Sequence, residues 1–430
     1  MAFLKNPLST LTKDKEEQRN MALLGSRNVL RRASFPLTSG DVVTPLNVAV
    51  GVRPETLAVW GIPGQILGFF IPFLCAAYGD RVFNRIRACV LLTLTGLLVP
   101  AELLVITLGP ERLRTLTVYM FITTVVGIVY SVFSRFFAVV EATMEARAIH
   151  NEVRGRFWSI FGIIAGLVGI GMGFITTFLL KYAGARYGLA LSCAIGSLLI
   201  IACAFLMARI RELPDLVGTV IPKKEKPPIF KSLKEVVCLK QFRILMPANF
   251  LRGMGNGFAG YVLLLAIPRM NLPSEYAGYT TIIGQVAVFV SYVILGLTMD
   301  RFGAGIVLPV TEVLMSVGIM MSVITCNPLV FLGAIFLWRV MSAVEESAVP
   351  LAHFDVVPVE VFGAFSAVRL GLLNITGALS GTIMGIALKW FAPTYVATYC
   401  CLMKLLCGIM FSYGVFAATR HVKAQQKTTE

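Results

Sequence analysis

Apolar residues occupy most of the chain in long blocks that are separated by short charged or Pro- and Gly-containing breaks. Each block is about 20 to 25 residues long, the length of helix that crosses about 30 Å of hydrocarbon. The pattern therefore predicts twelve membrane-spanning helices, six on each side of one long polar break. The predicted helices cover residues 28–50, 57–79, 86–108, 115–141, 157–180, 186–208, 244–268, 275–299, 304–325, 329–350, 361–388 and 393–419.

The long polar break contains clusters of Lys and Pro, which are typical of a solvated linker. It predicts five parts: a tail (1–27), a six-helix bundle (28–208), a cytoplasmic linker (209–243), a second bundle (244–419) and a tail (420–430). The helix at 28–50 is the least apolar of the set, since it carries Arg31, Arg32 and Asp41 with two prolines. We retain it because, without it, the basic loops would fall on alternating sides of the membrane.

The composition supports a membrane protein and excludes an ordinary soluble one. Of the 430 residues, 57% are hydrophobic and only 14% are charged, whereas soluble domains carry about 25% charged residues. Most Lys and Arg residues fall in loops on one side of the predicted helices, which places both termini in the cytoplasm by the positive-inside rule. The formal charge of +15 is explained by those loops facing anionic lipid, so no nucleic-acid partner is expected.

An internal repeat links the two halves. The segment SRFFAVVEA contains Arg135 and Glu141, and the segment WRVMSAVEE repeats this pair as Arg339 and Glu345 with the same spacing. Six residues advance a helix by about 600°, so Arg and Glu within one segment point in different directions and must find partners elsewhere. We place both glutamates at the cytoplasmic end of their helices, as gate residues.

A loop between two predicted helices reads GLTMDRFG, and the equivalent loop of the first half keeps the Asp-Arg pair in AAYGDRVFNR. The loop GLTMDRFG, which lies in the second half of the chain, resembles the signature G-x-L-x-D-R-x-G of the major facilitator superfamily. The resemblance implies an all-α fold of two six-helix repeats that rock around a central site, with the loops latching the cytoplasmic face. The implied latch residues are Gly296, Asp300 and Arg301 in the second half and Asp80 and Arg81 in the first.

Charged residues within the predicted helices are the candidates for binding or coupling, because a charge in hydrocarbon costs on the order of 2.5 to 3.5 kcal/mol. Asp41 is the carboxylate that we expect to oppose the central arginines and to carry a coupling proton. Arginine binds carboxylate and phosphate through two parallel hydrogen bonds, so several central arginines favour an anionic solute. The candidates are Asp41, Arg135, Arg252, Asn256, Arg339 and Arg369.

The sequence predicts a secondary active transporter, or permease, of the plasma membrane that moves a small organic solute by alternating access, with H+ as the coupling ion. Its partners are the solute, the proton and the lipid bilayer, and we expect a monomer. No H-E-x-x-H, G-x-S-x-G or Walker motif occurs, so an enzyme, a cofactor or a metal site is not expected. The alternatives are a lipid or cell-wall-precursor flippase and a transport-inactive sensor of the same fold.

Overall fold

The computed structural model describes residues 12, 14–38, 40–79, 84–213, 237–354 and 359–429, and all regular elements among them are helical. The helices before the second half of the chain are α1 Lys15–Thr38, α2 Gly40–Val50, α3 Pro54–Gly79, α4 Arg85–Leu94, η3 Thr95–Leu97, α5 Leu98–Leu108, η4 Glu111–Arg114, α6 Leu116–Ala148 and α7 Asn151–Met207. Those that follow are α10 Lys240–Asn256, η5 Ala259–Tyr261, α11 Val262–Met270, α12 Glu275–Phe302, α13 Ala304–Ile324, α14 Pro328–Phe354, α15 Val359–Ala387 and α16 Pro393–Thr429.

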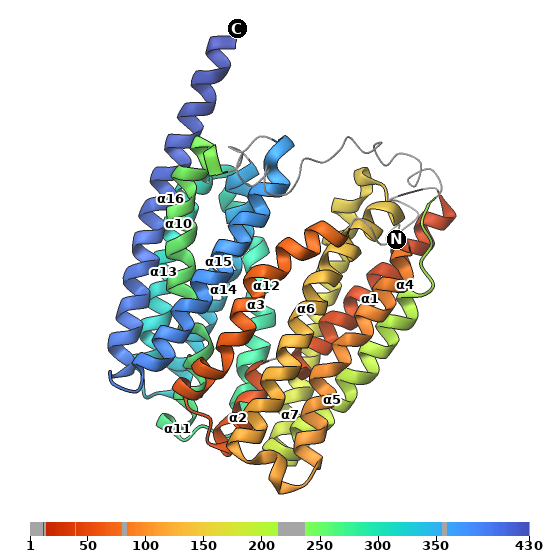
Figure 1. Ribbon diagram of the computed structural model, residues 1–430, viewed down its shortest axis with the longest axis vertical. Coiled ribbons are helices and arrows are strands. Elements are labelled where there is room, and N and C mark those ends of the chain that lie inside the picture. Colours follow the sequence, from red (N-terminus) through yellow and green to blue (C-terminus); the bar gives the residue numbers. More distant parts are fainter. Residues whose placement is uncertain are drawn as a thin grey trace. The chain divides into compact units, whose positions relative to one another are not determined.

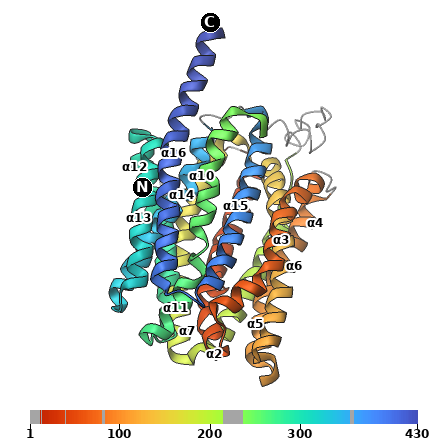
Figure 2. The same ribbon diagram turned by 60° about the vertical axis from the view of Figure 1, so that its left-hand side comes forward.

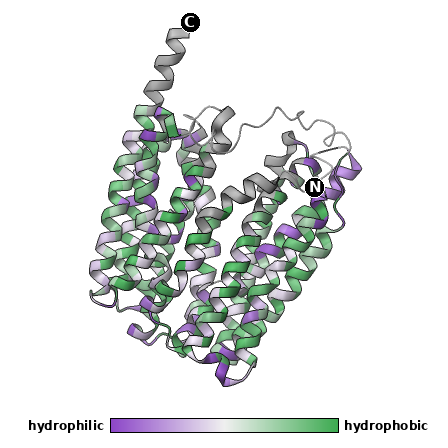
Figure 3. Ribbon diagram, in the orientation of Figure 1, coloured by the Kyte–Doolittle hydropathy of each residue, from purple (hydrophilic) through white to green (hydrophobic). Residues whose placement is uncertain are grey.

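Within this described part, nine helical stretches are long and apolar enough to cross a bilayer. One of them, Ile160–Met207, is 48 residues long and contains two of the predicted blocks. Apolar residues line most of the length of the helices, and hydrophilic residues lie at helix ends and loops and at some positions within the helices (Figure 3). The chain is therefore an integral membrane protein, with its backbone groups satisfied inside helices as hydrocarbon requires.

The helices form two compact units. Unit 1 comprises residues 1–46, 71–226 and 274–285, and unit 2 comprises residues 47–70, 227–273 and 286–430. Neither unit is one continuous segment, because α3 and α12 are each divided between the two. The linker and bundle boundaries expected from the sequence stay a prediction.

In unit 1, α1 packs along α7, and α4 and α5 pack against α6 and α7 (Figure 1). The core of this unit includes Met21, Leu24, Phe137 and Phe157, which are all buried. The first part of α12 also belongs to this unit, since the Ser274 hydroxyl donates a hydrogen bond of 3.2 Å to the backbone carbonyl oxygen of Leu180 in α7. A methyl group at Gly173 of α7 would lie 2.7 Å from the Ile282 side chain of α12, so glycine permits this close approach.

In unit 2, α13 packs against α14 and α16, and α10 packs against α15 and α16. Figure 2 shows these five helices running side by side. Gly257 at the end of α10 faces Gly381 of α15 so closely that a Cβ on Gly257 would lie 2.5 Å from the backbone nitrogen of Gly381. Small residues thus bring these two helix backbones together, as they do in many membrane bundles.

The first helices differ from the prediction. The predicted helix at 28–50 is helical up to Thr38 and again from Gly40, with residue 39 outside the described residues, and α1 begins at Lys15, well before residue 28. The early turns of α1 are too charged to register as a membrane span, but they pack on α7 and are helical for that reason. Between the predicted blocks 157–180 and 186–208, α7 changes direction at Gly184, whose φ of 72° favours glycine.

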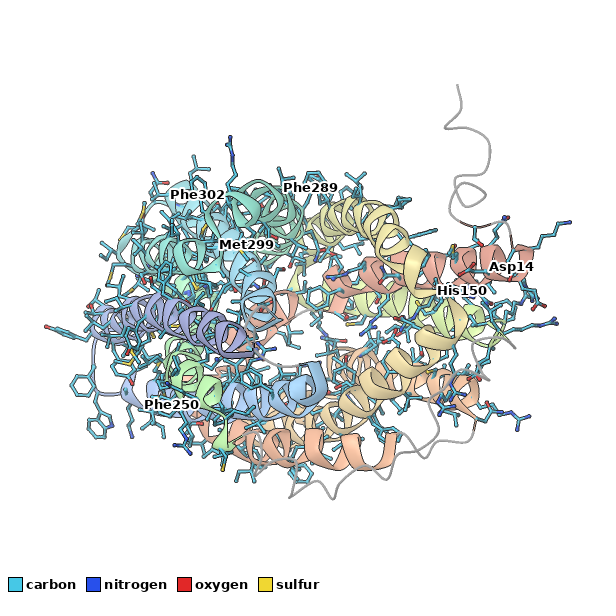
Figure 4. The ribbon with its side chains drawn as sticks, turned by 90° about the horizontal axis from the view of Figure 1, so that it is seen from above. Asp14, His150, Phe250, Phe289, Met299 and Phe302 are labelled. Atoms are coloured by element: carbon cyan, nitrogen blue, oxygen red, sulfur yellow. The ribbon has the colours of Figure 1, made fainter. Side chains whose placement is uncertain are left out.

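The beginning of α1 is tied to the α6–α7 corner of unit 1. The Glu17 carboxylate accepts hydrogen bonds from the backbone N–H of His150 at 2.8 Å and from its ring Nδ1 at 2.9 Å. Figure 4 labels His150 beside this N-terminal part of α1. Burial raises the pKa of Glu17, but hydrogen bonds from the Thr12 hydroxyl and from His150 outweigh it and hold the pKa below its ordinary value.

Candidate functional site

Unit 2 contains a buried cluster of four charged side chains, which we call the charge network: Arg252 of α10, Glu312 of α13, Glu345 of α14 and Lys404 of α16. The Arg252 Nε donates a hydrogen bond to Glu345 Oε1. The Lys404 Nζ lies 3.0 Å from Glu345 Oε2 and 3.3 Å from Glu312 Oε2. One ammonium group therefore bridges two carboxylates that come from different helices.

With both carboxyl groups ionised the charge network is neutral, since two cations face two anions. The side chains of Lys404 and Glu312 have 0% of their surface exposed, and those of Glu345 and Arg252 have 1% and 5%. Each ion would cost several kcal/mol to bury alone, so the four must remain together inside the membrane. The Cys407 thiol, 3.3 Å from Glu312 Oε1, supplies one further hydrogen bond.

This network gives Arg252 a carboxylate partner within unit 2, since Glu345 binds its guanidinium group. The expectation that Asp41 opposes one of the central arginines stays a prediction. Sequence reasoning missed Glu312, although it is the one acidic residue within the apolar helix α13 and an intramembrane charge is a signal in its own right. Nothing in the spacing of the sequence pointed to the partners of Lys404 on α13 and α14.

Unit 1 carries a related arrangement around Glu141 of α6. Arg27 and Arg31 lie one helical turn apart on α1, and both reach Glu141. The Arg31 Nη1 lies 3.2 Å from Glu141 Oε2, and Arg27 forms a hydrogen bond to Oε1. Both guanidinium groups also stand over the Phe137 ring, at 5.2 Å and 5.4 Å from its centroid, where the ring face attracts a cation.

The two glutamates of the sequence repeat therefore have the same kind of partner. Glu141 contacts an arginine of α1, and Glu345 contacts an arginine of α10. The prediction that these glutamates find partners outside their own helix is confirmed. The cytoplasmic gate role given to them stays a prediction.

The other candidate residues are spread over several helices. Asp41 lies half-buried in α2. Asn256 is the half-buried last residue of α10, and Arg369 is buried in α15. The Arg339 guanidinium carbon lies 5.6 Å from the ring centroid of Trp338. Arg135 lies on α6, but its side chain is outside the described part of the structure.

The signature loop is only partly described. Asp80 and Arg81 fall outside the described residues, as does the side chain of Asp300, which belongs to α12 together with Gly296. Arg301 is exposed at the end of α12. The closing glycine of the motif, Gly303, has φ 70° and ψ 165°, a conformation that is essentially restricted to glycine. The motif thus places an obligatory turn between α12 and α13.

No group of three or more His, Cys, Asp or Glu side chains within the described ranges has the arrangement of a metal site.

Similarity to known proteins was found by structure and not by sequence. No protein-family model matches the chain, and no curated protein matches it in sequence.

Solved structures match nearly the whole chain. A mutant of the nucleoside transporter NupG has a TM-score of 0.67 at 11% identity, with 94% of this chain and 99% of that chain covered. The D-xylose-proton symporter has a TM-score of 0.69 at 12% identity, with 91% and 97% covered. The chain therefore shares the fold of these solved transporters. An auto-inhibited peptide transporter of the POT family, with a TM-score of 0.67 at 10% identity and coverage of 92% and 96%, has this fold as well.

Proposed function

We propose that the protein is a secondary active transporter that moves a small organic solute across the plasma membrane by alternating access, with H+ as the coupling ion. The proposal includes twelve spans in two six-helix repeats, both termini in the cytoplasm and a monomeric state. The observation that carries it is the likeness of almost the full chain to transporters of three unrelated solutes. Since fold alone does not fix function, the argument must also use the site.

The charge network supplies that argument. A protein that needed only a stable bundle would gain as much from apolar side chains at these positions, because buried ion pairs seldom add net stability. Retention of four charges in unit 2 is therefore better explained by a function that uses them. Glu312 is the carboxylate we assign to proton binding. Among the described residues its ionic partner is Lys404, and Lys404 also forms an ion pair with Glu345, so the negative charge of Glu312 is only partly balanced.

The remaining site residues are assigned within the same proposal. Asp41 remains a second candidate for proton binding, and Asp80, Arg81, Gly296, Asp300 and Arg301 remain the proposed latch residues. Arg339 and Arg369 are the central arginines proposed to face an anionic solute, with Arg135 and Asn256 as further site residues. Arg252 is assigned to the charge network, because its carboxylate partner comes from the protein itself.

The test uses purified protein in liposomes that are supplied with a small-molecule extract of the source cells. Mass spectrometry then measures which compounds enter, with and without an imposed pH gradient. We expect at least one compound to accumulate above the level of protein-free liposomes, and only with the gradient. If no compound enters under either condition, the transport proposal is wrong.

Variants then separate coupling from binding. Glu312→Gln should abolish gradient-driven accumulation of that compound while preserving its exchange across the membrane, because the substitution removes only the titratable group. Asp41→Asn gives the same comparison for the second candidate. Glu111→Gln is the matched control, since its side chain is 97% exposed in η4. Normal accumulation by the Glu312 variant would assign that residue to structure alone.

A further inference from the structure

Unit 1 contains a pocket of about 380 Å³, within the range of cavities that hold small organic ligands. It lies among α1, α4, α5, α6 and α7, whose arrangement Figure 1 shows. Its described lining includes Arg27 and Arg31 but no carboxylate. The pocket is therefore positively charged on the side of α1.

Arg27 has hydrogen-bond donors to spare. Its side chain is only 2% exposed, and its one described hydrogen bond runs from Nη1 to Glu141. The Nε and Nη2 atoms have no hydrogen-bond partner among the described residues. These two atoms carry three of the five N–H donors of a guanidinium group, and burying such donors unsatisfied costs free energy.

The net charge around these N–H donors is positive, so it also favours an anionic ligand. Arg27 and Arg31 together carry two positive charges, and Glu141 supplies one negative charge to both. Among the described residues, these contacts leave one positive charge at the pocket without a paired carboxylate. A carboxylate or phosphate group would neutralise it and accept from the planar fork of Arg27, which matches the geometry of such anions.

The rest of the lining defines the body of the ligand. Phe35, Val99 and Phe137 provide apolar surface. The hydroxyl groups of Ser34 and Ser134 donate to carbonyl oxygens of their own helices, so only their oxygen lone pairs remain for a ligand. This combination suits a largely apolar body that carries one anionic group.

We propose that this pocket binds an organic anion, with the carboxylate or phosphate group of the ligand held by Arg27 and Arg31. The physiological use of the pocket rests on the proposed transport function, as the place where a solute binds, but the binding itself does not. The anionic group has two possible sources, a water-soluble acid or the headgroup of an acidic lipid. The chemistry is shared, and the experiment below separates the sources.

The test measures binding to purified protein in phosphatidylcholine nanodiscs by calorimetry and by thermal melting. The probes share one phenyl ring and differ in charge: phenyl phosphate, benzoate, benzyl alcohol and benzylamine. We expect the two anions to bind and to raise the melting temperature, and the neutral and cationic probes to do neither. Absence of binding by both anions at millimolar concentration, or equal binding by benzylamine, overturns the proposal.

Variants assign the binding to this pocket. Arg27→Lys keeps the charge opposite Glu141 but removes the fork, so phenyl phosphate should bind about tenfold more weakly or worse. Arg112→Lys, at an exposed position of η4, is the control and should bind as the wild type does. Ser134→Phe leaves Arg27 intact and fills the pocket, so it should abolish binding even if the lysine variant fails to fold. Wild-type affinity in Arg27→Lys or Ser134→Phe overturns the assignment.

Nanodiscs that also contain phosphatidic acid identify the source of the anion. Weakened binding of phenyl phosphate there, in the wild type, assigns the site to a lipid headgroup, and unchanged binding assigns it to a soluble acid. Uptake of phenyl phosphate into proteoliposomes is measured separately. Binding without uptake keeps the site and counts against the transport function, whereas uptake that Arg27→Lys leaves unchanged counts against the site.

Discussion

Lys404→Met is the most informative perturbation of the charge network. The substitution replaces a fully buried ammonium group with an apolar side chain of similar length, so the fold of α16 is not affected directly. It changes the network from neutral to a net charge of −1. Glu312 then loses its ionic partner, while Glu345 keeps Arg252.

The expected cost follows from burial. Removal of one partner from a buried pair costs about 3–5 kcal/mol, because the remaining charge has lost both water and its counter-ion. The geometry favours the upper part of this range, since Lys404 lies within 3.3 Å of two carboxylates whose side chains are at most 1% exposed. The free energy of unfolding of the variant should be lower than that of the wild type by that amount.

The double variant Lys404→Met/Glu312→Met tests whether charge imbalance is the cause. It leaves the neutral pair of Arg252 and Glu345 and puts apolar volume where the second pair stood. Buried ion pairs exchanged for apolar side chains are often neutral or stabilising, so the double variant should recover most of the loss. A coupling free energy of about 2–3 kcal/mol between the two substitutions is expected for contacting residues.

Reversible unfolding in mixed detergent and dodecyl sulfate micelles measures these free energies. The four tryptophans of the chain report unfolding by fluorescence, and circular dichroism reports loss of helix. A loss below about 1 kcal/mol in Lys404→Met would refute the view that Lys404 is an essential counter-ion. A double variant that is as unstable as the sum of the two single variants would refute the charge-balance explanation.

Three further predictions concern stability in the same assay. Gly303→Ala should cost about 1–3 kcal/mol, because alanine strains the φ of 70° although no atom lies within 4 Å of the added Cβ. Gly257→Ala should destabilise unit 2, because the Cβ would force α10 away from α15. Glu17→Gln should cost about 1.5–3 kcal/mol at neutral pH, through weaker hydrogen bonds from His150. Because the folded protein lowers the pKa of Glu17, this contribution is complete above the ordinary Glu pKa and is lost as pH falls through the lowered value.

Each of these predictions has a matched control. Gly127→Ala and Gly284→Ala add a methyl group to open space within α6 and α12, so they should be neutral or stabilise by about 0.5–1 kcal/mol. Equal losses at Gly303 and Gly127 would contradict the conformational explanation. Glu16→Gln, next to Glu17 but half exposed, should have little effect at any pH. A Glu17 effect that persists unchanged in acid would assign it to packing instead of charge.

Local patterns in the sequence were sufficient for the helices. Blocks of about 20 apolar residues predict helices because hydrocarbon leaves backbone groups no other hydrogen-bond partner, and each predicted block coincides with helix in the described residues. The closing glycine of the signature motif, Gly303, lies in the loop predicted between two blocks, where one residue type satisfies the backbone. The start of α1 at Lys15 was missed, because hydropathy reports transfer into lipid and says little about a charged helix that packs on α7.

The sites depend on contacts between residues far apart in the chain. Arg252 and Glu345 are 93 residues apart, and Glu345 and Lys404 are 59 apart. The sequence indicated that each intramembrane charge needs a partner, since its desolvation is costly wherever it lies. The choice of partner was settled only when helix packing brought α10, α13, α14 and α16 together. The same holds for Arg27, whose spare donors follow from the position of one carboxylate on α6. The desolvation cost of a charged side chain can be recognised from the residue and the apolar segment around it. Its counter-ion is decided by distances in the folded protein, which the sequence does not give.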